Sequence, residues 1–226
     1  PFYGMCRAEL LSVYEQPSSE HKVKQYRAIV LHSVMNKIYK NSMAMNNSNY
    51  IYEIIQKELN NNNYNGIYAD YNYIKLESDL IFELVKLAMK LETDNSKINM
   101  QLEESFIIEI NGVKISGRID RVDHYKGKSV LIDYKTGNFV KSDLYGDRPT
   151  SLQIPLYNIA FDPTEIEIWQ INPKSVKKIL IPISNEWGEK ISKLIKQIQI
   201  GEAIVDPVDL SVCKKCDLKE FCRVSG

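Results

Sequence analysis

The stretch that decides the fold runs Gly117-Arg118-Ile119-Asp120-Arg121-Val122-Asp123 and resumes, after a short polar turn, as Val130-Leu131-Ile132-Asp133-Tyr134-Lys135-Thr136-Gly137. Both segments are apolar enough to form strands, and each carries a carboxylate. Residues two positions apart on a strand point to the same face, so Asp133 and Lys135 project together while Tyr134 turns away. A hairpin over residues 124–129 would bring Asp120 alongside them.

This arrangement suits hydrolysis of a phosphodiester. Two carboxylates can hold a hard divalent cation such as Mg²⁺, and the cation lowers the pKa of a bound water. The ammonium of Lys135 can orient that water or neutralise charge that develops on the phosphate. An isolated Asp-x-Lys is commonly only a solvated ion pair. Here Asp133 lies at the end of an apolar run and a Gly-x-x-Asp segment precedes it, which favours a catalytic role.

These motifs resemble those of the PD-(D/E)XK nuclease superfamily, and most closely its RecB-like branch, where Gly-x-x-Asp precedes Asp-Tyr-Lys-Thr-Gly. The resemblance implies an α/β restriction-endonuclease-like fold, with a mixed central sheet flanked by helices. It also implies that Asp120 and Asp133 bind the metal with help from the Tyr134 carbonyl. Lys135 would then orient the attacking water.

Two satellite motifs follow the family order. The family's upstream helix carries a metal-binding histidine, matched here by His32, with Ala28 where the family usually has glycine. An imidazole ligand favours Mn²⁺ more than an all-oxygen site does. Downstream, the family's Gln-x-x-x-Tyr is matched by Gln153 and Tyr157, which share one helix face and would position Lys135 or the strand. An ordinary packed or surface role stays open for all three residues.

The four cysteines form a second group. Cys213, Cys216 and Cys222 are clustered near the C-terminus, and Cys6 stands alone near the N-terminus. Thiolates at such spacings bind zinc or an iron–sulfur cluster. The pattern is similar to iron–sulfur nucleases of the AddB family and of the fourth CRISPR-associated protein family, which implies a cluster, of 4Fe–4S type, joining both ends of the domain. Zinc and disulfides stay open as alternatives, although disulfides need an oxidising compartment.

Composition limits the organisation of the chain. With 226 residues and 44% hydrophobic content, it can bury one substantial core, and we expect a single nuclease domain over 1–226. Within it we expect a helical region at 23–91 and a catalytic core at 102–183. No apolar run approaches the ~20 residues of a membrane span, so we expect a soluble, cytoplasmic protein. Because the chain starts with Pro1, both a trimmed start and a longer parent protein stay open.

The formal net charge is zero, so contacts with nucleic acid have to be local. Arg118 and Arg121 flank Asp120, and we expect them to contact phosphates, because a guanidinium fork matches phosphate geometry. A weaker basic bias lies between residues 172 and 196, where a solvated helix face is the simpler explanation. Its members are Lys174, Lys177, Lys178, Lys190, Lys193 and Lys196.

Apolar periodicity predicts the remaining elements. Helices are expected over 23–39, 73–91, 151–160 and 185–200, and strands over 104–110, 113–120, 130–135, 165–171 and 178–183. An asparagine-rich break falls at 60–65. His21 and His124 have no motif support and are expected at the surface. Asp123 is expected to start the hairpin and not to bind a second metal.

The sequence therefore predicts a metal-dependent deoxyribonuclease that uses Mg²⁺ or Mn²⁺, with exonuclease action on single-stranded DNA ends. The resemblance to the fourth CRISPR-associated family implies trimming of DNA before spacer integration, in partnership with the integrase complex. An AddB-like or RecB-like nuclease domain for recombination and repair, working with a helicase subunit, is the alternative. A non-catalytic module that binds DNA or protein is the second.

Overall fold

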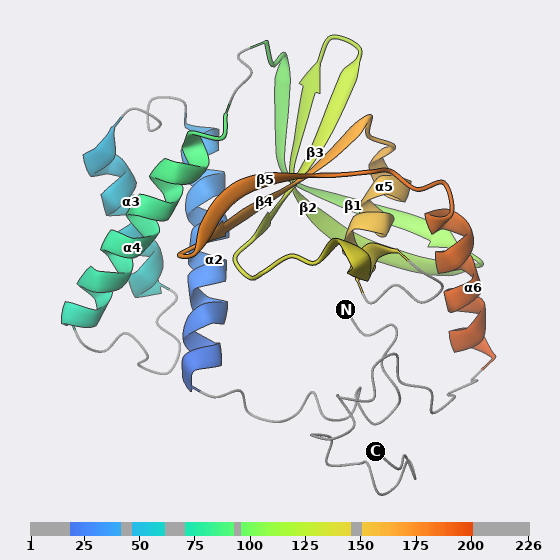
Figure 1. Cartoon of the computed structure of the whole chain (residues 1–226), viewed down its shortest axis with the longest axis horizontal. Coiled ribbons are helices and arrows are strands. Elements are labelled where there is room, and N and C mark those ends of the chain that lie inside the picture. Colours follow the sequence, from blue (N-terminus) through green and yellow to red (C-terminus); the bar gives the residue numbers. More distant parts are fainter. Residues whose placement is uncertain (1–18, 42–46, 62–70, 93–95, 146–150, 201–226) are drawn as a thin grey trace, which may run out of the picture.

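The computed structural model describes residues 19–41, 47–61, 71–92, 96–145 and 151–200 of the chain. In this part, three helices precede the first strand: α2 (Ser19–Lys40), α3 (Ser48–Asn61) and α4 (Tyr71–Met89). They pack against one another at one end of the molecule (Figure 1). The predicted N-terminal helical region is thus present.

In the described part of the chain, the sheet has five strands in sequence order: β1 (Asn99–Ile110), β2 (Val113–Tyr125), β3 (Lys128–Lys135), β4 (Glu165–Asn172) and β5 (Ser175–Ile181). Strands β3 and β4 pair in parallel, and the other neighbours are antiparallel. The crossover from β3 to β4 contains a short 3₁₀ helix, η3 (Lys141–Leu144), and helix α5 (Gln153–Phe161), while α6 (Trp187–Gln199) follows β5. This mixed sheet flanked by helices confirms the predicted α/β class.

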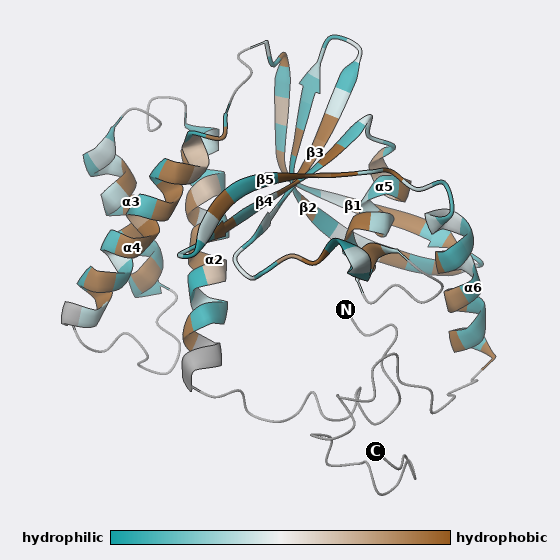
Figure 2. Ribbon diagram, in the orientation of Figure 1, coloured by the Kyte–Doolittle hydropathy of each residue, from teal (hydrophilic) through white to brown (hydrophobic). Residues whose placement is uncertain are grey.

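Two buried cores lie on opposite faces of the sheet. Ile132 of β3 and Ile171 of β4 pack with helices α2–α4, whereas Leu131 and Ile168 pack on the side of α5 and α6. Neighbouring residues thus enter different cores, as expected for strands covered on both faces. Figure 2 shows the resulting apolar run along β3. The end of β3 is therefore held rigidly from both sides.

The observed elements extend some of the predicted ones. Strand β1 begins at Asn99, β2 continues to Tyr125, and β5 begins at Ser175, earlier than expected. Helix α3 was not predicted as a separate element, because asparagines, which have low helix propensity, surround it. Its buried residues nevertheless have helical spacing: Ile51, Ile54, Ile55, Glu58 and Leu59.

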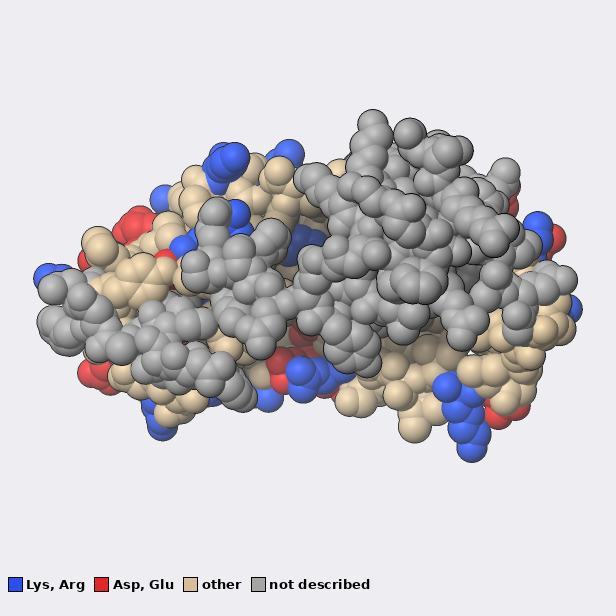
Figure 3. All heavy atoms as spheres, turned by 90° about the horizontal axis from the view of Figure 1, so that it is seen from below, with Lys and Arg blue, Asp and Glu red and all other residues tan. Residues whose placement is uncertain are grey.

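Surface charge is mixed. Figure 3 shows Lys and Arg side chains interspersed with Asp and Glu on the face seen from below. Among the described residues, no helix has the length and apolarity needed to cross a membrane.

Candidate active site

The site forms where β2 separates from β3. Antiparallel pairing of these strands runs from Tyr125 back to Arg121, which lies opposite Ile132, and goes no further. Beyond that point the backbone N–H of Tyr134 donates to Oδ2 of Asp120 at 2.8 Å. The carboxylate takes the place of a backbone acceptor in the ladder, so a buried donor stays satisfied. This contact fixes Asp120 beside the end of β3, as the predicted hairpin requires.

Helix α2 brings His32 to the same carboxylate. The Nδ1 atom of His32 lies 3.2 Å from Oδ1 of Asp120, although the two residues are far apart in sequence. The imidazole also packs edge-on against the ring of Tyr134, with centroids 5.8 Å apart. Burial lowers the pKa of His32, but the hydrogen bond and the negative charge of Asp120 outweigh it, so the pKa is raised overall. A cation at this pair therefore competes with a proton.

Asp133 and Lys135 form the second half of the site. Oδ2 of the fully buried Asp133 lies 2.8 Å from Nζ of Lys135, and Oδ1 accepts a hydrogen bond from Nε2 of Gln153 at 3.0 Å. Burial raises the pKa of Asp133 to about 6; the Lys135 ammonium opposes this shift, and the charge of Asp120 adds to it. The two side chains project together, as predicted from strand alternation, while the Tyr134 ring packs in the core beside α2.

Helix α5 ties both strands together through Gln153 and Tyr157. Gln153 accepts a hydrogen bond from Lys135 and donates one to the Tyr157 hydroxyl at 2.6 Å. That hydroxyl donates to the backbone carbonyl of Arg118 at 2.7 Å. A hydrogen-bond chain thus runs from the end of β3 to β2. The predicted common helix face is confirmed, and the role of these two residues in catalysis stays a prediction.

Gly117, the first residue of the Gly-x-x-Asp motif, gives a first testable prediction. A Cβ at this position would lie 2.6 Å from Cζ of Phe106, whose ring is held edge-on by Tyr157 and Phe161 with centroids 5.7 Å away. We expect Gly117→Ala to lower the free energy of unfolding by about 1–3 kcal/mol through overpacking. Urea denaturation measures this change.

The matched control is Gly137→Ala, because a Cβ at Gly137 meets no atom within 4 Å. We expect this variant to stay within about 0.5 kcal/mol of the wild type. Equal destabilisation by the two substitutions would contradict the overpacking argument.

The site offers carboxylate oxygens and an imidazole, which are the kinds of ligand that hard divalent cations such as Mg²⁺ and Mn²⁺ bind. Among the described residues, no three His, Cys, Asp or Glu side chains lie close enough together to form a complete metal site. However, the 3.2 Å between His32 Nδ1 and Asp120 Oδ1 is near the roughly 3 Å that separates adjacent ligands bound at about 2.1 Å. Oδ2 of Asp133 is buried and has the Lys135 ammonium 2.8 Å away as its partner. His32, Asp120 and Asp133 carry ligand atoms of the kind that Mg²⁺ or Mn²⁺ binds, and their role as ligands stays a prediction.

The two arginines beside Asp120 have different environments. Arg118 is 61% exposed and lies 3.3 Å from a carboxylate oxygen of Glu103, so it can face a ligand in solvent. Arg121 is fully buried, and its guanidinium binds Asp123 at 2.7 and 2.5 Å. The expectation that Arg121 contacts phosphate is therefore wrong, because its charge is already neutralised inside the fold.

Asp123 does more than start the hairpin. Its carboxylate is buried and pairs with both Arg121 and Lys97. His124, expected at the surface, is partly buried, and its Nε2 lies 2.7 Å from Oε1 of Gln101. Sequence reasoning missed this ion-pair group; the one signal it offered was that Arg121 and Asp123 are two residues apart on a strand and so share a face.

The remaining predictions concern the cluster ligands and the lysine-rich stretch. Cys6, Cys213, Cys216, Cys222 and the His21 side chain lie outside the described residues, so the iron–sulfur cluster stays a prediction. Within the lysine-rich stretch, Lys178 lies 3.4 Å from Glu167 and Lys190 lies 2.6 Å from Glu186. Lys190 lies on α6, as a helix-face explanation requires, whereas Lys178 lies on β5 and lines a pocket with Glu167 and Trp169.

Comparison with known proteins places the chain in a family. The family model described as the PD-(D/E)XK nuclease superfamily matches residues 13–223. No curated protein shows a significant match. Among solved structures, the chain is similar to "Crystal structure of SSO0001", with 21% sequence identity and a TM-score of 0.40. This distant likeness covers 67% of this chain and 76% of that one. Because the family match spans nearly the whole chain and includes both carboxylate-bearing strands, this chain belongs to the PD-(D/E)XK nuclease superfamily.

Proposed function

We propose that this chain is a deoxyribonuclease that cleaves single-stranded DNA from its ends with Mg²⁺ or Mn²⁺. Membership of the superfamily implies metal-dependent nuclease activity. The observation that carries the proposal is the meeting of His32–Asp120 with Asp133–Lys135 where β2 leaves β3. Carboxylates and an imidazole can hold a divalent cation that promotes phosphodiester hydrolysis, and an ammonium can stabilise the charge that develops on the phosphate.

Each residue of the site has a distinct task in this proposal. His32, Asp120, Asp133 and the carbonyl of Tyr134 would hold the cation. A divalent cation supplies Lewis acidity and lowers the pKa of a water bound to it. Asp120 is kept in place by the N–H of Tyr134, so little reorganisation is needed when the substrate arrives.

The remaining residues act on the attacking water and the phosphate. Lys135, held between Asp133 and Gln153, orients the water and stabilises charge on the phosphate oxygens. Tyr157 fixes the orientation of Gln153. Arg118 is placed at the surface of β2, where its guanidinium can bind a phosphate of the DNA backbone.

The proposed biological setting rests on the resemblance of the motifs and cysteines. It is the trimming of DNA before CRISPR spacer integration, with an iron–sulfur cluster held by Cys6, Cys213, Cys216 and Cys222 and with the integrase complex as partner. A recombination and repair nuclease working with a helicase subunit is the alternative. Neighbouring integrase genes support the first, and helicase genes the second; visible absorption with iron and sulfide counts tests the cluster.

A cleavage assay with end-labelled single-stranded DNA tests the proposed activity. We expect degradation with Mn²⁺ or Mg²⁺, complete loss with a chelator, and loss in Asp120→Asn. A covalently closed circle of the same sequence is the control, and an enzyme that needs ends leaves it intact. Cleavage of the circle would mean that the enzyme is an endonuclease and not an exonuclease. DNA binding without degradation would favour the non-catalytic module.

A further inference from the structure

Arg121 is a charged side chain with no access to solvent in this fold. Nε and Nη2 bond to the two carboxylate oxygens of Asp123 at 2.7 and 2.5 Å, and Nη1 lies 2.5 Å from Glu92. A buried charge is tolerated only when such partners replace water. Because Glu92 follows α4 and Asp123 lies on β2, the guanidinium joins the helical layer to the sheet.

Aromatic rings from two further elements contact the same guanidinium. The ring centroid of Tyr39, on α2, lies 4.4 Å from the guanidinium carbon, and that of Trp169, on β4, lies 5.1 Å away. Guanidinium groups stack favourably on aromatic faces while their N–H groups bond at the edges. Arg121 thus contacts α2, the segment after α4, β2 and β4 at one point.

This contact point lies next to the proposed cation ligands. Arg121 follows Asp120 directly on β2. Tyr39 follows His32 by seven residues, which is about two turns of α2, so the side chains of Tyr39 and His32 lie on the helix face toward the sheet. A second connection runs through Tyr134, whose ring centroid lies 5.8 Å from those of both Trp169 and His32. The helix that carries His32 and the strand that carries Asp120 therefore share one buried cluster.

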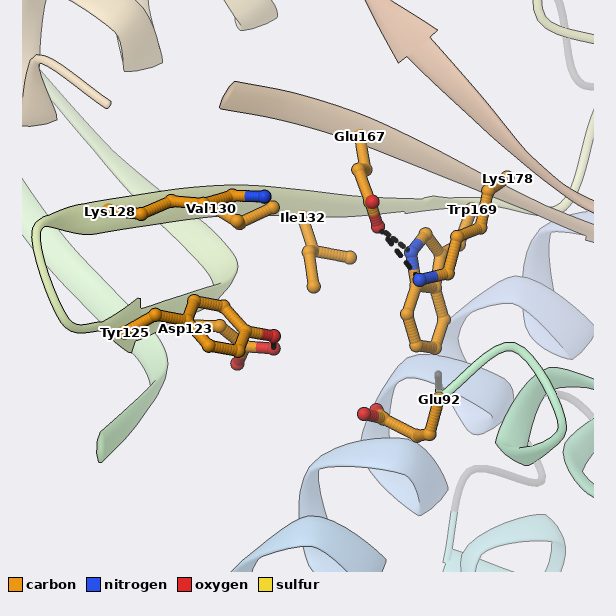
Figure 4. Close-up of a pocket in the computed structure, with 9 residues that line it drawn as sticks. All are labelled: Glu92, Asp123, Tyr125, Lys128, Val130, Ile132, Glu167, Trp169 and Lys178. Carbon is orange, nitrogen blue, oxygen red and sulfur yellow. Dashed lines mark hydrogen bonds and ion pairs between the residues drawn. The ribbon is translucent and has the colours of Figure 1, made fainter. Parts of the chain in front are cut away.

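The charges of this cluster balance. Lys97 lies 2.9 Å from Asp123 and 3.1 Å from Glu92, so two cations face two carboxylates. The two carboxylates line a pocket of about 130 Å³. Figure 4 shows Glu92 and Asp123 on facing sides of this pocket, with Trp169 nearby. Without Arg121, one of the two described cations that pair with these carboxylates would be lost, and the repulsion between Glu92 and Asp123 would be compensated less.

We propose that Arg121 is a positioning residue, which clamps α2 against β2 and so sets the distance between His32 and Asp120. The inference rests on the proposed function, because it assigns the cation to these two residues. Loss of residues that orient metal ligands typically weakens metal affinity 10–100-fold. The same range is expected here, with Arg121 acting on the two ligands through the helix and the strand that carry them.

The test compares Arg121→Met with two other variants. We expect Arg121→Met to weaken Mn²⁺ binding, measured by calorimetry, about 10–100-fold, and Arg121→Lys to recover part of that loss. The matched control is Arg27→Met, which breaks another α2 ion pair, between Arg27 and Glu77 at 2.9 and 2.5 Å. We expect Arg27→Met to lower stability and leave Mn²⁺ affinity unchanged.

A measurement without metal tests the positioning role of Arg121 independently of the proposed nuclease function. The edge contact of His32 with Tyr134 should give a nuclear Overhauser effect between the two rings, which Arg121→Met should weaken. If the wild type binds no Mn²⁺, the proposed function fails, and this comparison still decides the role of Arg121. A folded Arg121→Met protein with wild-type affinity and ring contact would overturn the inference, as would an equal loss of affinity in Arg27→Met.

A second substitution covers the case in which Arg121→Met does not fold. Tyr39→Leu removes the ring that contacts the guanidinium and leaves the buried ion pairs in place. It should also weaken Mn²⁺ binding and the ring contact, whereas Tyr39→Phe, which keeps the ring, should not. Wild-type behaviour of Tyr39→Leu would contradict the clamp.

Discussion

Replacing Lys135 with methionine is expected to lower the rate of DNA cleavage about 10²–10³-fold, which is the usual effect of removing one preorganised group that stabilises charge in the transition state. Lys135 Nζ lies 2.8 Å from Asp133, also donates to Gln153, and keeps 28% of its side chain exposed. It is therefore held in one place while still facing the substrate. Methionine keeps the length of the side chain and removes the charge.

Single-turnover cleavage of labelled single-stranded DNA at saturating Mn²⁺ measures this effect on the chemical step. Lys128→Met is the matched control, because Lys128 lies on the same strand and pairs with Glu165 at 2.8 Å, but at the hairpin end of β3. We expect its cleavage rate to stay close to the wild-type value. An undiminished rate in Lys135→Met would remove this lysine from the mechanism.

Local rules were enough to predict half of the site. Strand alternation places Asp133 with Lys135, and helical spacing places Gln153 with Tyr157. The separation of β2 from β3 could not be predicted in this way, because it depends on how β2 pairs with β1 on its other side. Without that separation, the N–H of Tyr134 would bond to backbone and not to Asp120.

The error on Arg121 has a similar cause. A guanidinium next to a catalytic carboxylate is chemically suited to phosphate, and its sequence neighbours do not reveal whether it is buried. Glu92 and Tyr39, which neutralise and cover it, come from a helical layer whose packing is set by tertiary contacts. Among these partners, Asp123 could be predicted from strand alternation, because it lies two residues from Arg121 on the same strand.

The second large effect is on stability, where Asp133→Asn is expected to stabilise the metal-free protein at pH 8 while abolishing cleavage. Burial raises the pKa of Asp133 from 3.8 to about 6, so the folded state binds this proton more tightly than the unfolded chain does. The stability that this proton contributes is complete below about pH 4 and lost as the pH rises through 6. Above that pH the buried charge destabilises the fold by on the order of 1–3 kcal/mol.

Asparagine removes this charge and can still bond to Gln153, while the partly exposed Lys135 can be solvated by water. Urea denaturation with a chelator at pH 5 and pH 8 should show stability falling with pH in the wild type and a weaker fall in the variant. A variant less stable than the wild type at both values would mean that the carboxylate stabilises the fold and that the argument is wrong.

Glu58 provides the contrasting control. Burial would raise its pKa, but hydrogen bonds from Lys37 and from Ser33, the latter at 2.5 Å, outweigh this and lower it. Its ionised form therefore stabilises the fold above the ordinary pKa of a glutamate, and Glu58→Gln should destabilise the protein at pH 8. Added Mn²⁺ should raise the stability of the wild type and of Glu58→Gln by mass action, and that of Asp133→Asn much less. Opposite signs at two buried carboxylates would mark Asp133 as a residue kept for cation binding at the expense of stability.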